Sequence, residues 1–147
     1  MKLSTRGEYG TLALLDLALH RGGEPVPLKD IAQRQGIPLH YLEHLITPLI
    51  AAGIVRSVRG ARGGVWLARP PQEVRLSEVI QLLEGSIAPV ECLNDPESCS
   101  RSDLCDPRDI WAELKKAMDG VLETTTLQDL VERQERKKPP EGAMYYI

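Results

Sequence analysis

Apolar residues recur at helical spacing through the first third of the chain. Between residues 4 and 21 they lie three and four positions apart, at Leu12, Leu15, Ala18 and Leu19. This spacing places them on one face, so we predict a helix with Ser4 as its N-cap and a single buried stripe. Gly22-Gly23 and the two prolines of segment 24–27 then end the helix and form a rigid connector.

Two shorter helices are predicted next, at residues 28–35 and 39–52, separated by Gly36-Ile37-Pro38. The second has a core stripe made of Leu42, Leu45, Ile46 and Leu49. Two short helices joined by a three-residue turn with glycine form the helix-turn-helix pattern, whose second helix can enter the major groove of DNA. The outward face of that helix would carry side chains able to bond to or stack near base edges: His40, Tyr41, Glu43, His44 and Thr47. The alternative is an ordinary pair of packed helices with a solvated face.

At Gly53 the pattern changes to β-rich runs, at residues 54–58 and 65–68. The connection between them, Arg59-Gly60-Ala61-Arg62-Gly63-Gly64, is rich in glycine and carries two arginines. A hairpin of this kind directly after a helix-turn-helix predicts a wing, because glycine allows close approach to nucleic acid and a minor groove attracts guanidinium groups. The second helix contains no Lys or Arg, so phosphate contacts are expected from the wing and the N-terminus, at Lys2, Arg56, Arg59 and Arg62.

The second half of the chain is predicted to contain three more helices. The first, with Ser77 as its cap, closes the winged domain and ends at Gly85. The second is long, from Asp106 as N-cap to about residue 123. Its apolar face is wider than one neighbour would need: Ile110, Trp111, Leu114, Ala117, Met118, Val121 and Leu122. We therefore predict a dimerisation helix, with packing on its own chain as the alternative. Thr126 can cap the last helix.

The expected fold is mainly α with a small β-hairpin wing. A winged helix-turn-helix domain spans residues 1–86, a cysteine loop spans 87–106, dimerisation helices span 107–134, and 135–147 form a flexible tail.

All three cysteines lie in one polar segment, at Cys92, Cys99 and Cys105, with six and then five residues between them. The segment has no helical or strand period, so it is predicted to be a loop on which three thiols can converge. An odd number of cysteines cannot all pair within one chain, and thiolates are the ligands that soft metals and iron–sulfur clusters prefer. The cysteines therefore indicate a metal centre; three unrelated loop thiols are the alternative.

The charge distribution supports the same organisation. The net charge is −3, but residues 1–75 carry ten Lys/Arg and six Asp/Glu, whereas residues 76–147 carry eight and fifteen. A basic first half suits contact with a polyanion. No run approaches the roughly 18 apolar residues of a membrane span, and the start is unlike a signal peptide, so we expect a cytoplasmic protein. No nucleophile–base pair, phosphate-cradling motif or pair of carboxylates in a plausible cleft is found, so we expect no enzyme.

These motifs, taken in order, resemble the IscR-type family of winged-helix iron–sulfur regulators over about residues 1–134. Four stretches are typical of that family, as are the three cysteines before a long helix. The stretches are Met1-Lys2-Leu3-Ser4-Thr5-Arg6-Gly7-Glu8-Tyr9, Gln33-Arg34-Gln35-Gly36-Ile37, Tyr41-Leu42-Glu43 and Val58-Arg59-Gly60-Ala61-Arg62-Gly63-Gly64.

The resemblance implies a homodimeric transcription factor that binds duplex DNA at promoters. It implies an iron–sulfur cluster, [2Fe–2S] more than [4Fe–4S], on the three cysteines and one other ligand. Tyr41 and Glu43 match positions of the base-contacting helix, and Arg59 matches a wing arginine placed in the minor groove.

The sequence departs from the family pattern in three places. Well-known members use a histidine shortly after the third cysteine, where this chain has Asp106-Pro107-Arg108. In the nitric-oxide-sensing branch of the family an acidic residue at the position of Glu8, from the partner chain, is a ligand, so the resemblance implies Glu8 as the fourth ligand, with Asp103 and Asp106 as rivals. The first cysteine gap is one residue longer than usual. In the recognition helix, Pro48 and Ile50 lie in a segment that often carries basic residues in other family members. A cluster-free repressor switched by thiols or zinc is the alternative on the same scaffold.

Overall fold

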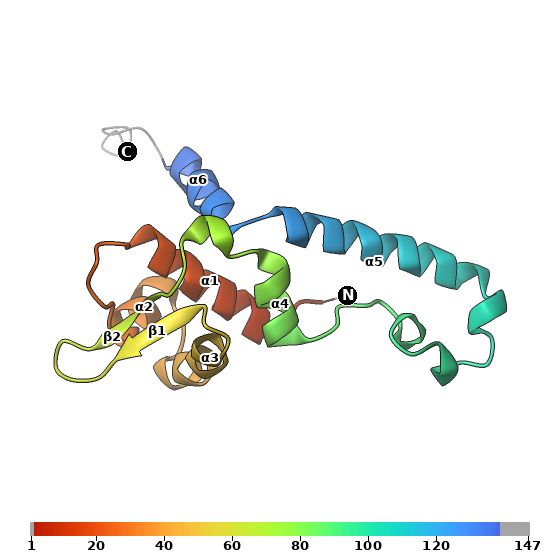
Figure 1. The fold of residues 1–147 in the computed structure, drawn as a ribbon, viewed down its shortest axis with the longest axis horizontal. Helices are drawn as coiled ribbons and strands as arrows, with labels where there is room; N and C mark the ends of the chain where they lie inside the picture. Colours follow the sequence, from red (N-terminus) through yellow and green to blue (C-terminus); the bar gives the residue numbers. More distant parts are fainter. Residues whose placement is uncertain (1, 139–147) are drawn as a thin grey trace, which may run out of the picture.

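The computed structural model describes residues 2–138, which contain six α-helices and one two-stranded sheet (Figure 1). The prediction of a mainly α-helical winged fold is therefore confirmed. The helices are α1 (Thr5–Leu19), α2 (Leu28–Gln35), α3 (Leu39–Ala51), α4 (Leu76–Glu84), α5 (Asp106–Thr124) and α6 (Leu127–Lys137). The strands are β1 (Val55–Val58) and β2 (Gly64–Leu67), and four short 3-10 turns are η1 (Pro71–Glu73), η2 (Glu91–Leu93), η3 (Pro96–Ser98) and η4 (Ser102–Leu104).

The helix-turn-helix motif is formed by α2 and α3. Gly36 ends α2 with φ of 66°, in the left-handed region that glycine adopts without a steric cost. The predicted stripe of α3 is buried as expected: Leu42, Leu45, Ile46 and Leu49. The opposite side of α3 therefore faces solvent.

The wing is an antiparallel hairpin in which Val55 pairs with Leu67 and Val58 with Gly64. Val26, from the connector before α2, adds one isolated bridge to Val65, with backbone hydrogen bonds of 2.8 and 2.9 Å. These bonds attach the hairpin to the helices, so the loop from Arg59 to Gly63 projects from a supported base (Figure 1).

The buried face of α1 differs from the predicted one. Leu12 is exposed and Leu15 and Leu19 are half-buried, whereas the residues in the core are Gly7, Gly10, Ala13, Leu14, Asp16, Leu17 and Ala18. Two of them are glycines because α4 packs directly against α1: a Cβ at Gly10 would overlap Cδ1 of Leu83, and one at Gly7 would lie 2.5 Å from the Glu84 carboxylate. Spacing alone could not reveal this, since it depends on α4.

Of the four predicted N-caps, Ser4 and Thr126 occupy the cap position, and the other two are replaced by other residues. Ser4 stands at the N-cap of α1, but its side chain makes no cap bond to the helix; the Glu84 carboxylate accepts from Ser4 N and Gly7 N, both at 3.0 Å, and from the Ser4 hydroxyl. The N-caps of α4 and α5 are Arg75 and Cys105 instead of Ser77 and Asp106. Thr126 does cap α6, through a capping box with Asp129.

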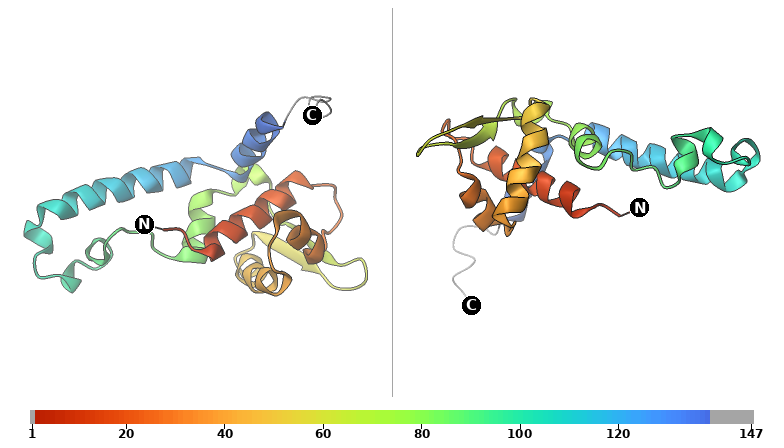
Figure 2. Two further views of the ribbon diagram at one scale, coloured as in Figure 1. Left: turned by 180° about the vertical axis from the view of Figure 1, so that it is seen from behind. Right: turned by 90° about the horizontal axis from the view of Figure 1, so that it is seen from below.

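The last helix, which the sequence grouped with the dimerisation helices, packs in the core of the winged domain. Leu127 and Val131 of α6 lie in the core with α1, and Leu127 N donates to Val74 O at 2.9 Å. In contrast, α5 contacts α4 only through its second half, and its first half extends away from the winged domain, with the cysteine segment running outward alongside it (Figures 1 and 2). Part of the predicted tail, residues 135–137, is helical; residues 139–147 lie outside the described residues. None of the helices described is both long and apolar enough to cross a membrane.

Candidate nucleic-acid interface and metal centre

The solvent-facing side of α3 carries most of the residues predicted to contact bases. His40, Glu43 and His44 are exposed. Tyr41 is different: it is half-buried, and its ring packs edge-on against Tyr9 of α1, with ring centroids 5.6 Å apart. Tyr41 therefore stabilises the packing of α3 on α1 and is less accessible than the other residues predicted to contact bases.

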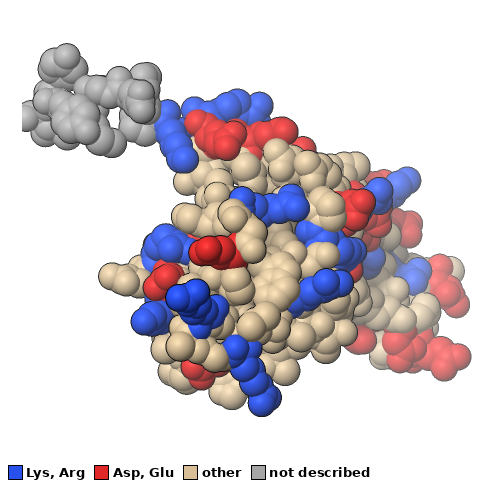
Figure 3. All heavy atoms as spheres, turned by 60° about the vertical axis from the view of Figure 1, so that its left-hand side comes forward, with Lys and Arg blue, Asp and Glu red and all other residues tan. Residues whose placement is uncertain are grey.

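The predicted arginines of the wing are exposed. Arg56 lies on β1 opposite Trp66, and Arg59 and Arg62 lie in the loop at the tip of the hairpin. Figure 3 shows Lys and Arg gathered on the face that carries the wing, whereas acidic side chains are common on the arm. The separation of charge predicted along the sequence is thus also a separation in space.

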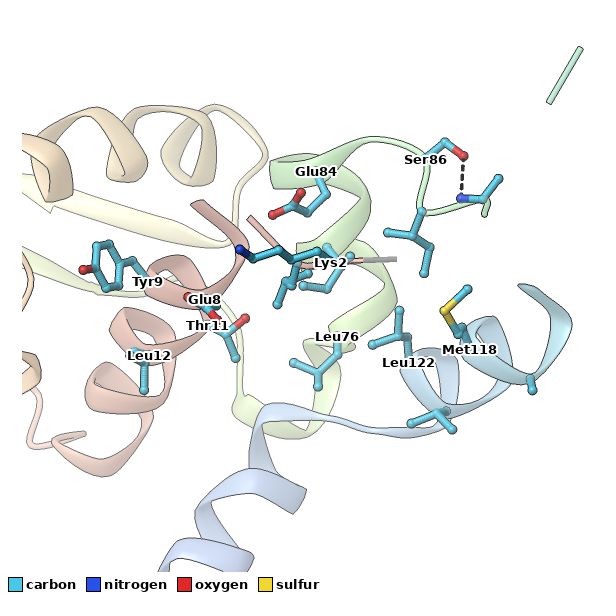
Figure 4. Close-up of a pocket in the computed structure, with 16 residues that line it drawn as sticks. Lys2, Glu8, Tyr9, Thr11, Leu12, Leu76, Glu84, Ser86, Met118 and Leu122 are labelled. Carbon is cyan, nitrogen blue, oxygen red and sulfur yellow. Dashed lines mark hydrogen bonds between the residues drawn. The ribbon is translucent and has the colours of Figure 1, made fainter. Parts of the chain in front are cut away.

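The N-terminal residues Lys2 and Glu8 lie in a different place from the cysteines. Both line a groove of about 960 Å³ between the first half of α1, α4 and the second half of α5 (Figure 4). Most of the other lining residues are apolar, including Leu12, Ile80 and Met118. Glu8 is therefore exposed toward the groove.

The three cysteines are distributed along the segment that leads to α5. Cys92 is in η2, Cys99 follows η3, and Cys105 is the N-cap of α5; all three are free thiols. Cys92 and Cys105 are half-buried and Cys99 is exposed. The segment was predicted to be an irregular loop, and its three 3-10 turns are too short to produce a periodic apolar pattern.

The donor chemistry of this segment suits an iron–sulfur cluster, but the thiols are not gathered into a site. Within residues 2–138, no three His, Cys, Asp or Glu side chains lie close enough together to hold a metal ion. Cluster binding would therefore require the segment to rearrange. Its contacts allow this, because the turns pack mainly on each other and on α5, and Ser102 is the one residue of η2, η3 and η4 that is buried.

Two residues that contact the cysteine segment or lie directly before it, Arg108 and Glu84, were not identified from the sequence. Arg108, in the first turn of α5, points one guanidinium nitrogen at the carbonyl of Cys92, 3.4 Å away. Glu84, directly before the segment, holds the N-terminus of α1. The sequence contained one signal for Arg108, namely its place shortly after the third cysteine, where the family has a histidine. There was none for Glu84, whose partners are 77 and 80 residues away.

Comparison with known proteins agrees with the resemblance found in the sequence. The family model Rrf2, described as an iron-dependent transcriptional regulator, matches residues 3–133. The chain belongs to the Rrf2 family. Members of this family are transcriptional regulators, so this Rrf2 protein is a DNA-binding regulator of transcription.

The relatives of this Rrf2 protein include more than one kind of regulator. It is 48% identical to protein rrf2 of Nitratidesulfovibrio vulgaris over 131 residues, 89% of this chain and 87% of that protein. It is 40% identical to CymR of Bacillus subtilis over the whole of both chains; the structure of that protein, described as the global cysteine regulator, superposes with a TM-score of 0.76 over 90% of this chain and 98% of the other. The T. potens IscR structure, 40% identical, has a TM-score of 0.79 over 99% of this chain and 97% of that one. The IscR-type resemblance is thus confirmed, while a cysteine regulator is equally similar.

Proposed function

We propose that this protein is a homodimeric regulator whose binding to promoter DNA is controlled by an iron–sulfur cluster held by Cys92, Cys99 and Cys105. The observation that carries this proposal is three unpaired thiols on one weakly attached segment at the start of the arm helix. Thiolates on a short, adaptable segment are the ligand set that Fe–S clusters use. Bound there, a cluster would supply chemistry that responds to oxidants, nitric oxide and iron supply.

The proposed DNA contacts divide between two elements. His40, Glu43 and His44 of α3 face the base edges in the major groove. Arg59 and Arg62 extend from the wing toward a minor groove, with Lys2 and Arg56 as further phosphate contacts. Since α3 has no Lys or Arg, the wing supplies most of the attraction to the DNA backbone.

The proposed fourth ligand is Glu8, from the partner subunit. It is exposed on α1 and lines a groove that also includes residues of α5, the helix we assign to the dimer contact. Asp103 and Asp106 are the alternatives from the segment itself. The cluster type that we favour remains [2Fe–2S].

Control of DNA binding would follow from linkage. A cofactor that binds one arrangement of the two subunits more tightly than another shifts the spacing of their DNA-binding domains. If the cofactor changes the affinity for DNA by a given factor, DNA changes the affinity for the cofactor by the same factor. The chain has a suitable connection, because Glu84 joins the start of the cysteine segment to the N-terminus of α1, next to Glu8.

The cluster proposal predicts a change in both composition and DNA affinity when the thiols are removed. Anaerobically purified wild-type protein should contain iron and acid-labile sulfide and absorb visible light, and the Cys92→Ser, Cys99→Ser, Cys105→Ser triple variant should not. Operator affinity should differ between them by about 5- to 150-fold. Ser98→Ala, in the same segment, is the control and should match the wild type; Glu8→Ala should weaken cluster retention if Glu8 is a ligand.

Equal iron content and equal operator affinity in wild type and triple variant would reject this proposal. Colourless wild-type protein that contains zinc, or that forms disulfides, would instead support the second candidate, a thiol- or zinc-switched repressor. That candidate is favoured by the full-length similarity to CymR, whose name identifies it as a transcriptional regulator and whose structure is described as that of a cysteine regulator.

We infer the homodimer from the apolar face of α5, which stays largely exposed in the single chain. This 19-residue helix, about 28 Å long, has no buried residue in the single chain, and Ile110 and Val121 are 56% and 63% exposed. Val121→Glu should therefore weaken the dimer by roughly 100-fold or more, because each interface would bury two new charges. Sedimentation equilibrium should show twice the 16.3 kDa chain mass for wild type and the single mass for the variant. Lys116→Glu, exposed on the other side of α5, is the charge control, and dissociation of both variants alike would contradict the assignment.

A further inference from the structure

The solvent-facing side of α3 changes character along its length. Its first half carries His40, Glu43 and His44, whereas its second half carries Thr47, Ile50 and Ala51, all of them exposed and uncharged. Residues three, four and seven apart share one side of a helix, so the two groups form one continuous stripe. The buried stripe from Leu42 to Leu49 fixes its outward direction.

Thr47 presents its methyl group and not its hydroxyl proton. Its Oγ1 donates to the carbonyl of Glu43, at 3.2 Å, so the single O–H is used within the helix. One turn further, the aliphatic side chain of Ile50 is 36% exposed. Thr47 and Ile50 together therefore place aliphatic surface on the side of α3 that would face DNA.

The major-groove edge of DNA offers one apolar partner for such a surface, the 5-methyl group of thymine. The charged side chains that favour phosphates are missing here, since no Lys or Arg occurs between Arg34 and Arg56. An aliphatic side chain packed on a thymine methyl excludes water from both groups, and cytosine, adenine and guanine have nothing equivalent to offer.

We propose that Thr47 and Ile50 are specificity-determining residues that select thymine in each half-site by packing against its 5-methyl group. This inference rests on the proposed placing of α3 in the major groove. It goes beyond that placing, because it assigns a base identity to the half of the helix whose exposed side chains carry no charge and no free hydroxyl proton.

The test uses duplexes in which single thymines are replaced by deoxyuracil, which removes the methyl group and keeps every hydrogen-bonding group. A binding site is first selected from random duplexes with the full-length protein, and each thymine of one half-site is then replaced in turn. At one or two positions the replacement should lower the affinity, measured by fluorescence anisotropy at fixed salt, by about three- to tenfold, as expected for the loss of one or two methyl contacts.

Matched variants connect the effect to the two side chains. Thr47→Val keeps a methyl group and should keep the preference for thymine over deoxyuracil at its position; Thr47→Ser keeps the hydroxyl and should lose it. Ile50→Ala should bind the two duplexes equally at the position that it contacts. Because both residues are exposed, circular dichroism should show an unchanged fold.

Two results would overturn the inference. One is the absence of any deoxyuracil effect; the other is an effect of equal size in wild type, Thr47→Ser and Ile50→Ala. Arg59→Ala separates this failure from that of the interface itself: weaker binding to all sequences supports docking through the wing, whereas unchanged binding would reject the docking and the thymine contact with it. If Ile50→Ala binds DNA like wild type but loses binding to another protein, the exposed surface serves protein contact and the proposal is wrong.

Discussion

Replacing Asp16 with alanine is expected to lower the free energy of unfolding by about 3 kcal/mol. The Asp16 side chain is fully buried in α1 and accepts hydrogen bonds from Arg34 Nε at 3.0 Å, Arg34 Nη2 at 2.7 Å and Gln35 Nε2 at 2.9 Å. Its removal leaves these donors unpaired beside the core. Arg34 is 36% exposed and can regain water, which keeps the loss at the lower end for a broken buried pair.

Urea denaturation followed by circular dichroism measures this loss, and a second ion pair provides the control. Arg69 and Glu78 are 2.6 Å apart, but their side chains are 32% and 41% exposed, so Glu78→Ala should cost less than about 1 kcal/mol. Equal losses in the two variants would show that burial of the Asp16 carboxylate adds nothing to stability.

The Asp16–Arg34 pair also predicts how the stability difference between wild type and Asp16→Ala depends on pH. Burial by itself raises the pKa of Asp16, but the hydrogen bonds from Arg34 and Gln35, with the charges of Arg34 and His20, outweigh burial and hold this pKa below its usual value. A carboxyl whose pKa is lower in the folded state stabilises the fold fully above its unfolded pKa, about 3.9. The gap between wild type and Asp16→Ala should therefore be constant from about pH 5 to 8 and shrink as the pH falls below about 4. A gap that widens in acid would contradict the assignment.

Gly10→Ala in α1 is expected to lower the free energy of unfolding by about 1–2 kcal/mol, and Gly10→Val by about 3 kcal/mol. Two effects compete. Alanine favours a helix over glycine by about 1 kcal/mol, but the added Cβ overlaps Cδ1 of Leu83, which is 2% exposed and enclosed by the core. The steric overlap with Leu83 should outweigh the gain in helix propensity, because a closely packed interior cannot shift without losing contacts elsewhere.

Gly120→Ala gives the opposite expectation within the same chain. Gly120 is also helical, in α5, but nothing lies within 4 Å of an added Cβ, so stability should rise by up to about 1 kcal/mol. Thermal and urea unfolding of the two variants separate packing from helix propensity. If Gly10→Ala were also stabilising, Leu83 would have moved aside, and the close contact between α1 and α4 could not be rigid.

Local patterns were enough to predict much of the fold. The buried stripe of α3, the glycine turn at Gly36 and the capping box at Thr126 all depend on residues within a few positions of each other. The wing was predictable for the same reason, since a two-stranded hairpin is a local structure. Exposure of the wing arginines follows from their place in its loop.

Contacts between residues that are far apart in the sequence could not be predicted from local patterns. The spacing in α1 favoured Leu12 and Leu15 for the core, but the charged Asp16 is buried instead because Arg34 and Gln35, 18 and 19 residues away, satisfy it. Tyr41 was expected to face outward, yet Tyr9 covers its ring. The boundary between domains was misplaced because α6 follows the arm in sequence but packs on α1.

The sequence by itself therefore determined the helices and strands, the helix-turn-helix with its wing, and the set of thiols available for chemistry, because each depends on residue type and short spacing. The tertiary structure alone decided which face of α1 is buried, that α6 packs in the core of the winged domain while the first half of α5 extends beyond it, and that Glu84 connects the cysteine segment to α1. The physical reason is that burial and charge compensation are set by partners that the fold brings together from far along the chain.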